Sequence, residues 1–104
     1  MIGRLWRGAT RRGDAEAYRR FLAEDLLPGL LEFDGYREAY VLTREAGDEV
    51  EFLTLTFFES MDAVRAFAGP TPEQPVIEAE AARLLVRIGE RVEHLDVAVD
   101  HRPG

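Results

Sequence analysis

The sequence predicts an α+β fold in which helices cover one face of a single antiparallel sheet. Three observations support this prediction. The 104 residues alternate between extended and helical patterns, a short polar segment joins the second and third extended stretches as in a hairpin, and the third stretch is apolar on both faces. The length allows one domain with one core over residues 1–104.

The first half of the chain is expected to begin with one strand and one helix. Residues 1–10 alternate as a strand, which puts Arg4 and Trp6 on the same face. A helix is expected from Asp14 to about Leu27, because apolar residues recur at the spacing of one helical face, namely Tyr18, Phe21, Leu22 and Leu26. Pro28 lacks a backbone donor and is expected to kink or end this helix, although one further turn over 30–31 stays open.

A hairpin and a second helix follow. Residues 36–44 and 51–58 are expected to form antiparallel strands joined by the polar connection around Gly47. Ser60 occupies a helix N-cap position, and the helix after it is expected to end at Gly69, which a proline follows.

The C-terminal third is less regular. We expect an isolated turn at 71–74, a helix over 76–88 that ends at Gly89, a strand over 91–100 and a frayed tail. Residues 16–21 (Glu-Ala-Tyr-Arg-Arg-Phe) are similar to residues 62–67 (Asp-Ala-Val-Arg-Ala-Phe), as expected if two βαβ halves pack equivalent helix faces on one sheet. The order of elements is that of a ferredoxin-like split βαβ fold with a four-stranded antiparallel sheet.

The second face of this sheet also needs cover. Helices can cover only one face, yet the strand over 51–58 is apolar on both. A second copy of the chain is the simplest cover. We therefore expect a twofold homodimer whose sheets face each other and bury more than ~1,200 Å².

Composition excludes several classes of protein. The 13 basic and 20 acidic residues give a net charge of -7, which disfavours nucleic acid and anionic membranes as partners. No apolar run is long enough to span a bilayer and no secretion signal is recognisable, so a cytoplasmic location is expected. The chain has no Cys, no Lys and a single Ser, which argues against thiolate, Schiff-base and acyl-transfer chemistry.

Three segments carry a resemblance to a known family: Ile2-Gly3-Arg4-Leu5-Trp6-Arg7-Gly8, the stretch 57–69 from Phe57 to Gly69, and Val92-Glu93-His94-Leu95-Asp96-Val97. Together they make nearly the whole chain resemble the antibiotic biosynthesis monooxygenase family of the dimeric α+β barrel superfamily. The resemblance implies a dimeric α+β barrel built from one such domain. The superfamily also contains haem-degrading enzymes, peroxidases and proteins of no known activity, so its reaction is less specified than its fold.

Family oxygenases are expected to work without cofactor or metal. A phenolic substrate is held in an apolar pocket between sheet and helices and deprotonated, and its anion reduces molecular oxygen. The resemblance thus implies a cofactor-independent monooxygenase that oxidises a phenolic or quinol-type polycyclic aromatic. Two alternatives remain open: a non-catalytic homodimeric module that binds a small apolar aromatic, and a structural dimer with a filled core.

Candidate site residues follow from this resemblance. His94 is the candidate base, because the unperturbed pKa of a histidine side chain is about 6.5, and Trp6 is the candidate cavity wall. Arg4 could hold an anion. The remaining candidates for substrate binding are Thr54, Thr56, Phe58, Phe67 and Tyr40, for each of which ordinary packing or strand formation is the competing interpretation.

The chain departs from two patterns of the superfamily. Haem-degrading members use an Asn, a Trp and an axial His, whereas this chain has no Asn, carries Trp6 and Phe67 at the first two positions and has no His in the segment 76–88. The anthrone-oxygenase pattern also relies on an Asn. His94 and His101 would point to opposite faces of a strand, which disfavours a histidine metal site.

Overall fold

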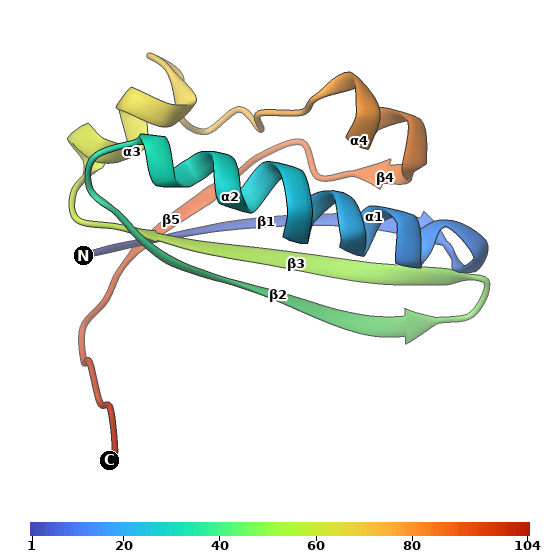
Figure 1. The fold of residues 1–104 in the computed structure, drawn as a ribbon, viewed down its shortest axis with the longest axis horizontal. Coiled ribbons are helices and arrows are strands. Elements are labelled where there is room, and N and C mark those ends of the chain that lie inside the picture. The colour runs from blue at the N-terminus through green and yellow to red at the C-terminus, as the bar shows by residue number, and fades with distance from the viewer.

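A computed structural model describes all residues, 1–104, and shows one antiparallel sheet with helices over one face (Figure 1). The strands are β1 (Ile2–Arg11), β2 (Tyr36–Ala46), β3 (Glu49–Phe58), β4 (Leu85–Ile88) and β5 (Glu93–Asp96). β3 lies between β2 and β1, and both β4 and β5 pair with the other edge of β1. This α+β arrangement is the expected ferredoxin-like fold, with its last strand divided in two.

The first helical layer is longer than predicted. It runs from a 3₁₀ turn at Arg12–Asp14 through α1 (Ala15–Phe21), a π-helical segment (Leu22–Leu26), α2 (Leu27–Gly29) and a 3₁₀ turn at Leu30–Glu32. Pro28 does not end it. In the π-helical segment the Leu27 amide donates to the Leu22 carbonyl five residues back, a widened turn that accommodates the proline.

The second helix, α3 (Met61–Ala68), confirms the capping prediction. The Ser60 hydroxyl accepts a hydrogen bond from the Ala63 amide at 3.2 Å, and Gly69 follows the last helical residue. The expected turn at 71–74 is also present, because the Gln74 amide donates to the Thr71 carbonyl at 3.1 Å.

The predicted helix over 76–88 is wrong over most of its length. Only α4 (Ala79–Leu84) is helical, and the chain becomes extended at Leu85, where β4 begins. The free edge of β1 explains the difference, since β4 satisfies its backbone groups and the Gly89 amide donates to the Arg7 carbonyl at 2.9 Å. The last strand is likewise confined to β5, shorter than the predicted 91–100.

The register of the sheet separates two faces. Arg4 lies opposite Thr56 and Trp6 opposite Thr54, so these four residues share the face that the helices cover. The main core cluster lies under α1 and α4 and consists of Tyr18, Phe21, Leu22, Phe52, Ala81, Leu84 and Leu85. The opposite face, here called the outer face, carries Leu5, Tyr40, Leu42, Leu53, Leu55, Phe57 and Leu95.

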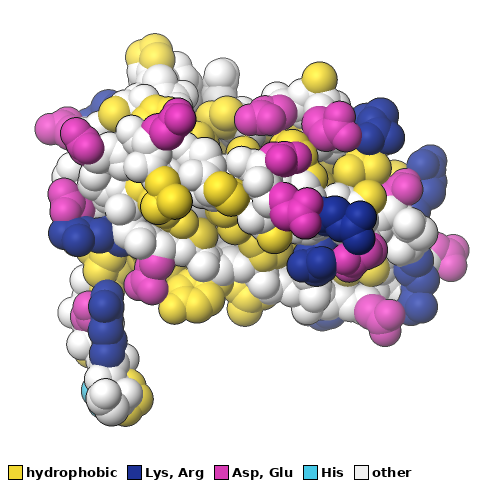
Figure 2. Space-filling view, viewed as in Figure 1, with side chains coloured by type: hydrophobic (Ala, Val, Ile, Leu, Met, Phe, Trp, Pro, Cys, Tyr) yellow, Lys and Arg dark blue, Asp and Glu magenta, His cyan; other side chains and the backbone are white.

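Charged side chains of both signs are interleaved on the surface (Figure 2). Several form exposed ion pairs, among them Arg44 with Glu51 at 2.9 Å and Arg87 with Glu49 at 2.8 Å. Pairs of this exposure contribute little to stability. No helix has the length and apolar character that crossing a membrane requires.

Candidate functional site

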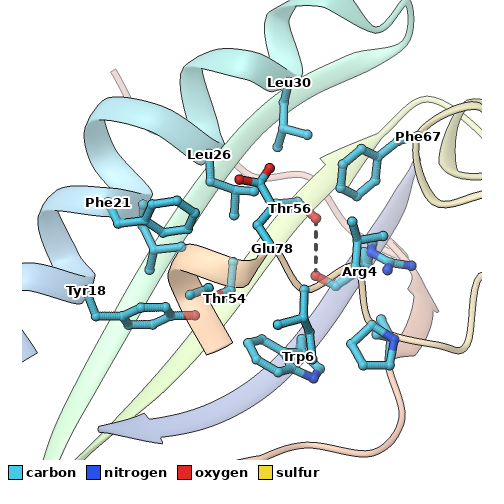
Figure 3. A pocket seen from close by; sticks show the side chains of 16 residues that line it. Arg4, Trp6, Tyr18, Phe21, Leu26, Leu30, Thr54, Thr56, Phe67 and Glu78 are labelled. Carbon is cyan, nitrogen blue, oxygen red and sulfur yellow. Dashed lines mark hydrogen bonds between the residues drawn. The ribbon is translucent and has the colours of Figure 1, made fainter. Parts of the chain in front are cut away.

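A cavity of about 60 Å³ lies between the helix-covered face of the sheet and the helices (Figure 3). Eleven of its 16 lining residues are hydrophobic. Its walls come from β1, β3, the first helical layer, α3 and the segment Pro75–Glu78, which is neither helix nor strand. Ligand pockets usually measure about 300 Å³ or more, so a polycyclic ligand requires a wall to move.

Arg4 is the charged group at the centre of this site. Its side chain is 6% exposed, and its Nη1 donates to the Pro72 carbonyl at 2.7 Å and to His94 Nε2 at 2.9 Å. Burial lowers the pKa of Arg4 to about 10, with Glu73 acting in the opposite direction. The guanidinium therefore stays protonated at neutral pH, and all its hydrogen-bond partners are uncharged.

Phe67 and Trp6 form apolar walls on either side of Arg4. The Arg4 guanidinium carbon lies 5.6 Å from the centre of the Phe67 ring, within range of a cation–π interaction. The Trp6 Nε1 donates to the Gly89 carbonyl at 2.8 Å. Because this bond uses the only polar atom of the indole, Trp6 offers the cavity an apolar surface.

The two threonines of β3 also face the cavity but differ in bonding. Thr56 Oγ1 donates to the Arg4 carbonyl at 3.5 Å (Figure 3). Thr54 Oγ1 is buried and has no hydrogen-bond partner. One threonine is thus tied to the sheet, and the other retains unused hydrogen-bonding capacity.

His94 does not line the cavity. It lies on β5 directly opposite Arg4 in the ladder, and its Nε2 accepts the hydrogen bond from that arginine. Burial lowers the pKa of His94, as do Arg4 and Arg65, while Glu73 opposes them. The imidazole is therefore neutral at pH 7, and its free electron pair is directed at Arg4. This geometry makes His94 a positioning residue for the guanidinium.

Two more sequence candidates lie outside the cavity lining. Phe58 is fully buried in a separate cluster with Ala63 and Val64, where its ring stacks on Phe67 at 5.9 Å. Tyr40 lies on the outer face, is 55% exposed and donates to Glu38 at 3.2 Å. The structure therefore brings together Arg4, Trp6, Thr54, Thr56 and Phe67, but not Phe58, Tyr40 or His94.

Sequence reasoning missed two polar residues of the lining, Tyr18 and Glu78. Tyr18 is 2% exposed, and burial raises its pKa to about 12. Figure 3 shows its hydroxyl directed toward Thr54. The available signal was a tyrosine on an otherwise aliphatic and phenylalanine helix face, since buried tyrosine hydroxyls usually have a partner. Nothing in the sequence marked Glu78, which precedes α4 in an extended conformation.

Comparison with known proteins identifies solved structures that have the same fold. Neither a family model nor a curated relative matches the sequence. Solved structures do match. A candidate antibiotic biosynthesis monooxygenase from Bacillus cereus has a TM-score of 0.68 and 13% identity, with 100% of this chain and 97% of that chain covered.

Two further structures have similar scores. A Nitrosomonas europaea protein of unknown function has a TM-score of 0.66 and 18% identity over 99% of this chain and 94% of that one. A monooxygenase from Streptomyces coelicolor, solved with the ligand Nanaomycin D, has a TM-score of 0.65 and 13% identity over 99% and 92%. The chain therefore has the fold of the antibiotic biosynthesis monooxygenase structures, as the resemblance implied.

Proposed function

We propose that this chain binds a phenolic aromatic as its anion in the cavity and oxidises it with molecular oxygen, as a cofactor-independent monooxygenase. The observation that carries the proposal is Arg4, a protonated side chain buried among apolar walls with no carboxylate bonded to it. A buried cation without an anionic partner is costly. A bound phenolate would supply that partner.

The chemistry follows from the same charge. An opposite charge at short range lowers the pKa of an acid, so Arg4 favours the ionised form of a bound phenol. The electron-rich phenolate passes electrons directly to oxygen, takes up one oxygen atom and releases the other as water with two hydrogens from the substrate, so that no further reductant is needed. Glu78, an exposed residue, is the one carboxylate in the lining and is the group able to receive the phenolic proton, in place of the expected base His94. The largely apolar lining limits the water around the developing charge.

Support for a small-molecule ligand comes from the Streptomyces coelicolor monooxygenase, which binds Nanaomycin D in a fold of the same kind. In this chain a ligand of several rings would displace the segment Pro75–Glu78, which lines the cavity. That segment is neither helix nor strand; it is held by the Glu78 carbonyl, which accepts the Ala82 amide at 2.9 Å, and by Ile77, which packs against the main core cluster.

We also propose that the working unit is a homodimer joined through the outer face. Large apolar side chains remain exposed there, including Leu42 at 50% and Leu95 at 52%. Apolar patches of this kind mark interaction surfaces.

The second candidate function is a non-catalytic module that binds the same anion. The position of His94 favours it, because the expected base does not reach the cavity. Binding without turnover would distinguish this function from the oxygenase.

The test loads the protein anaerobically with a reduced naphthoquinol and then admits oxygen. We expect product faster than the spontaneous rate. Arg4→Met should lower kcat/KM by roughly 30-fold or more, because the variant loses a charged hydrogen-bonding partner of the substrate. His94→Ala and Trp6→Ala should lower kcat/KM by a smaller factor. The matched control is Arg7→Met, an exposed arginine on the opposite face of β1. No rate above the spontaneous one with any of a panel of naphthoquinols and anthrones would refute the oxygenase.

A further inference from the structure

Thr54 carries a polar atom that the fold itself does not use. Its Oγ1 is the one buried side-chain oxygen or nitrogen without a hydrogen-bond partner, and Thr54 is one of the residues that line the cavity. A valine would fill the same space in a strand without this cost. Thr56, two residues further along β3, bonds to a backbone carbonyl. The unpaired hydroxyl of Thr54 is thus available to a hydrogen-bond partner from outside the chain.

Tyr18 presents a second hydroxyl to the same place. Its ring is fixed edge-to-face against Phe52 at 4.7 Å and stacked on Phe21 at 6.4 Å. These contacts direct the hydroxyl toward Thr54 (Figure 3). Desolvation alone accounts for the raised pKa of Tyr18, so the group remains a neutral donor at any physiological pH.

The two hydroxyls lie away from the charged end of the cavity. Thr54 pairs with Trp6 in the ladder, whereas Thr56 pairs with Arg4. Two residues along a strand span about 7 Å, and Arg4 itself extends toward Pro72 and Phe67. The backbone positions that carry the two ends are therefore about 7 Å apart, a separation that a single substituted aromatic ring can span.

We infer that Tyr18 and Thr54 form an uncharged binding subsite that takes a neutral carbonyl or hydroxyl oxygen of the ligand. This inference rests on the proposed function, in which the ionised oxygen of the ligand contacts Arg4. The second oxygen of the ligand then lies on the other side of its aromatic ring. The Tyr18 hydroxyl donates to that second oxygen, and the Thr54 hydroxyl donates to it or accepts from it. The ligand class is a hydroxyaryl ketone, or a quinol with oxygens on opposite sides of a ring.

The experiment compares two single-ring probes, which require less movement of the cavity wall than a polycyclic ligand does. 4-Hydroxyacetophenone has a phenol and a carbonyl, and 4-ethylphenol has the phenol but no carbonyl. Affinity is measured by calorimetry and by NMR of the indole N–H of Trp6, the only tryptophan. We expect the ketone to bind at least roughly 3- to 10-fold more tightly than 4-ethylphenol, because it gains one neutral hydrogen bond and because its phenol is more acidic; the variants separate these two contributions.

Tyr18→Phe and Thr54→Val remove the hydroxyls with little change of shape. Each should weaken binding of the ketone and leave that of 4-ethylphenol unchanged. Thr54→Val should also raise the Tm of the free protein, because it removes an unpaired buried hydroxyl. Tyr36→Phe is the matched control, since this half-buried tyrosine packs on Phe58 and does not line the cavity.

The outcomes separate the subsite from the proposed function. An affinity for the ketone that is the same in both variants as in the wild type would overturn the subsite and leave the phenolate site intact. A lower Tm for Thr54→Val would also overturn it, because the hydroxyl would then be structural. No binding of either phenol to the wild type would overturn both.

Discussion

Arg4 shows how a single residue can hold an unneutralised positive charge inside this fold. Its guanidinium donates only to neutral acceptors, two of them carbonyls of the segment before α4 and one the imidazole of His94. These bonds fix the orientation of the side chain without neutralising its charge. The charge remains available to a ligand, as preorganised electrostatic stabilisation requires.

His94 makes the stability of the protein depend on pH. Its pKa in the folded chain is lowered, first by burial and then by Arg4, so the unfolded chain binds a proton at higher pH than the folded chain does. The contribution of His94 to the free energy of unfolding is therefore fully present above its unfolded pKa of about 6.5. It is lost progressively as the pH falls below that value. We expect the Tm to fall more steeply from pH 8 to pH 5.5 in the wild type than in His94→Gln.

The control for this pH series is His101→Gln, because His101 lies in the exposed tail. This variant should follow the wild-type curve. Parallel curves for the wild type and His94→Gln would contradict the lowered pKa of His94.

At the scale of elements, the connection between the first helical layer and β2 is tightly packed against α3. Gly35 has φ +89, and a Cβ there would lie 2.6 Å from the Cβ of Ala63 at the start of α3. Its carbonyl accepts the Glu59 amide at 2.8 Å. The chain therefore needs glycine here for both its conformation and its space.

Gly35→Ala should lower the free energy of unfolding by about 2 to 4 kcal/mol, the sum of a left-handed conformation and an overpacked contact. Gly47→Ala is the matched control. Gly47 has φ +63 in the hairpin turn, but a Cβ there meets nothing within 4 Å, so only about 1 to 2 kcal/mol should be lost. Equal losses in urea unfolding would show that the contact with Ala63 relaxes freely.

At the scale of the whole molecule, the outer face is an apolar surface that nothing in a single chain covers. Only 20 of 104 residues are buried in the isolated chain, while the outer face holds a continuous set of apolar side chains on four strands. Ion pairs such as Arg7 with Glu93 and Arg44 with Glu51 lie at its margins. A twofold contact would cover the apolar centre and leave the charges at the rim.

We expect light scattering after gel filtration to give the mass of a dimer. Leu55→Glu should shift it to the monomer, because a charge at the centre of a dry interface loses its solvation. Leu31→Glu is the control, since Leu31 is 76% exposed in the helical layer, on the other side of the sheet. A monomeric wild type, or a dimeric Leu55→Glu, would contradict this interface.

Local patterns were enough to predict much of this protein. Alternation placed Arg4, Trp6, Thr54 and Thr56 on strands, and Ser60 and Gly69 marked both ends of α3, because these signals depend on near neighbours in the chain. The family resemblance of residues 2–8, 57–69 and 92–97 predicted how these elements are arranged in the fold.

Only the tertiary structure decided the rest. The segment 85–88 became a strand because the edge of β1 needed a partner, and the sequence contains no local mark of that edge. The register of the strands places Tyr40 on the outer face of the sheet and His94 directly opposite Arg4. Packing of α1 on the sheet brought the Tyr18 hydroxyl toward Thr54. Each depends on contacts between residues far apart in the chain, which periodicity does not encode.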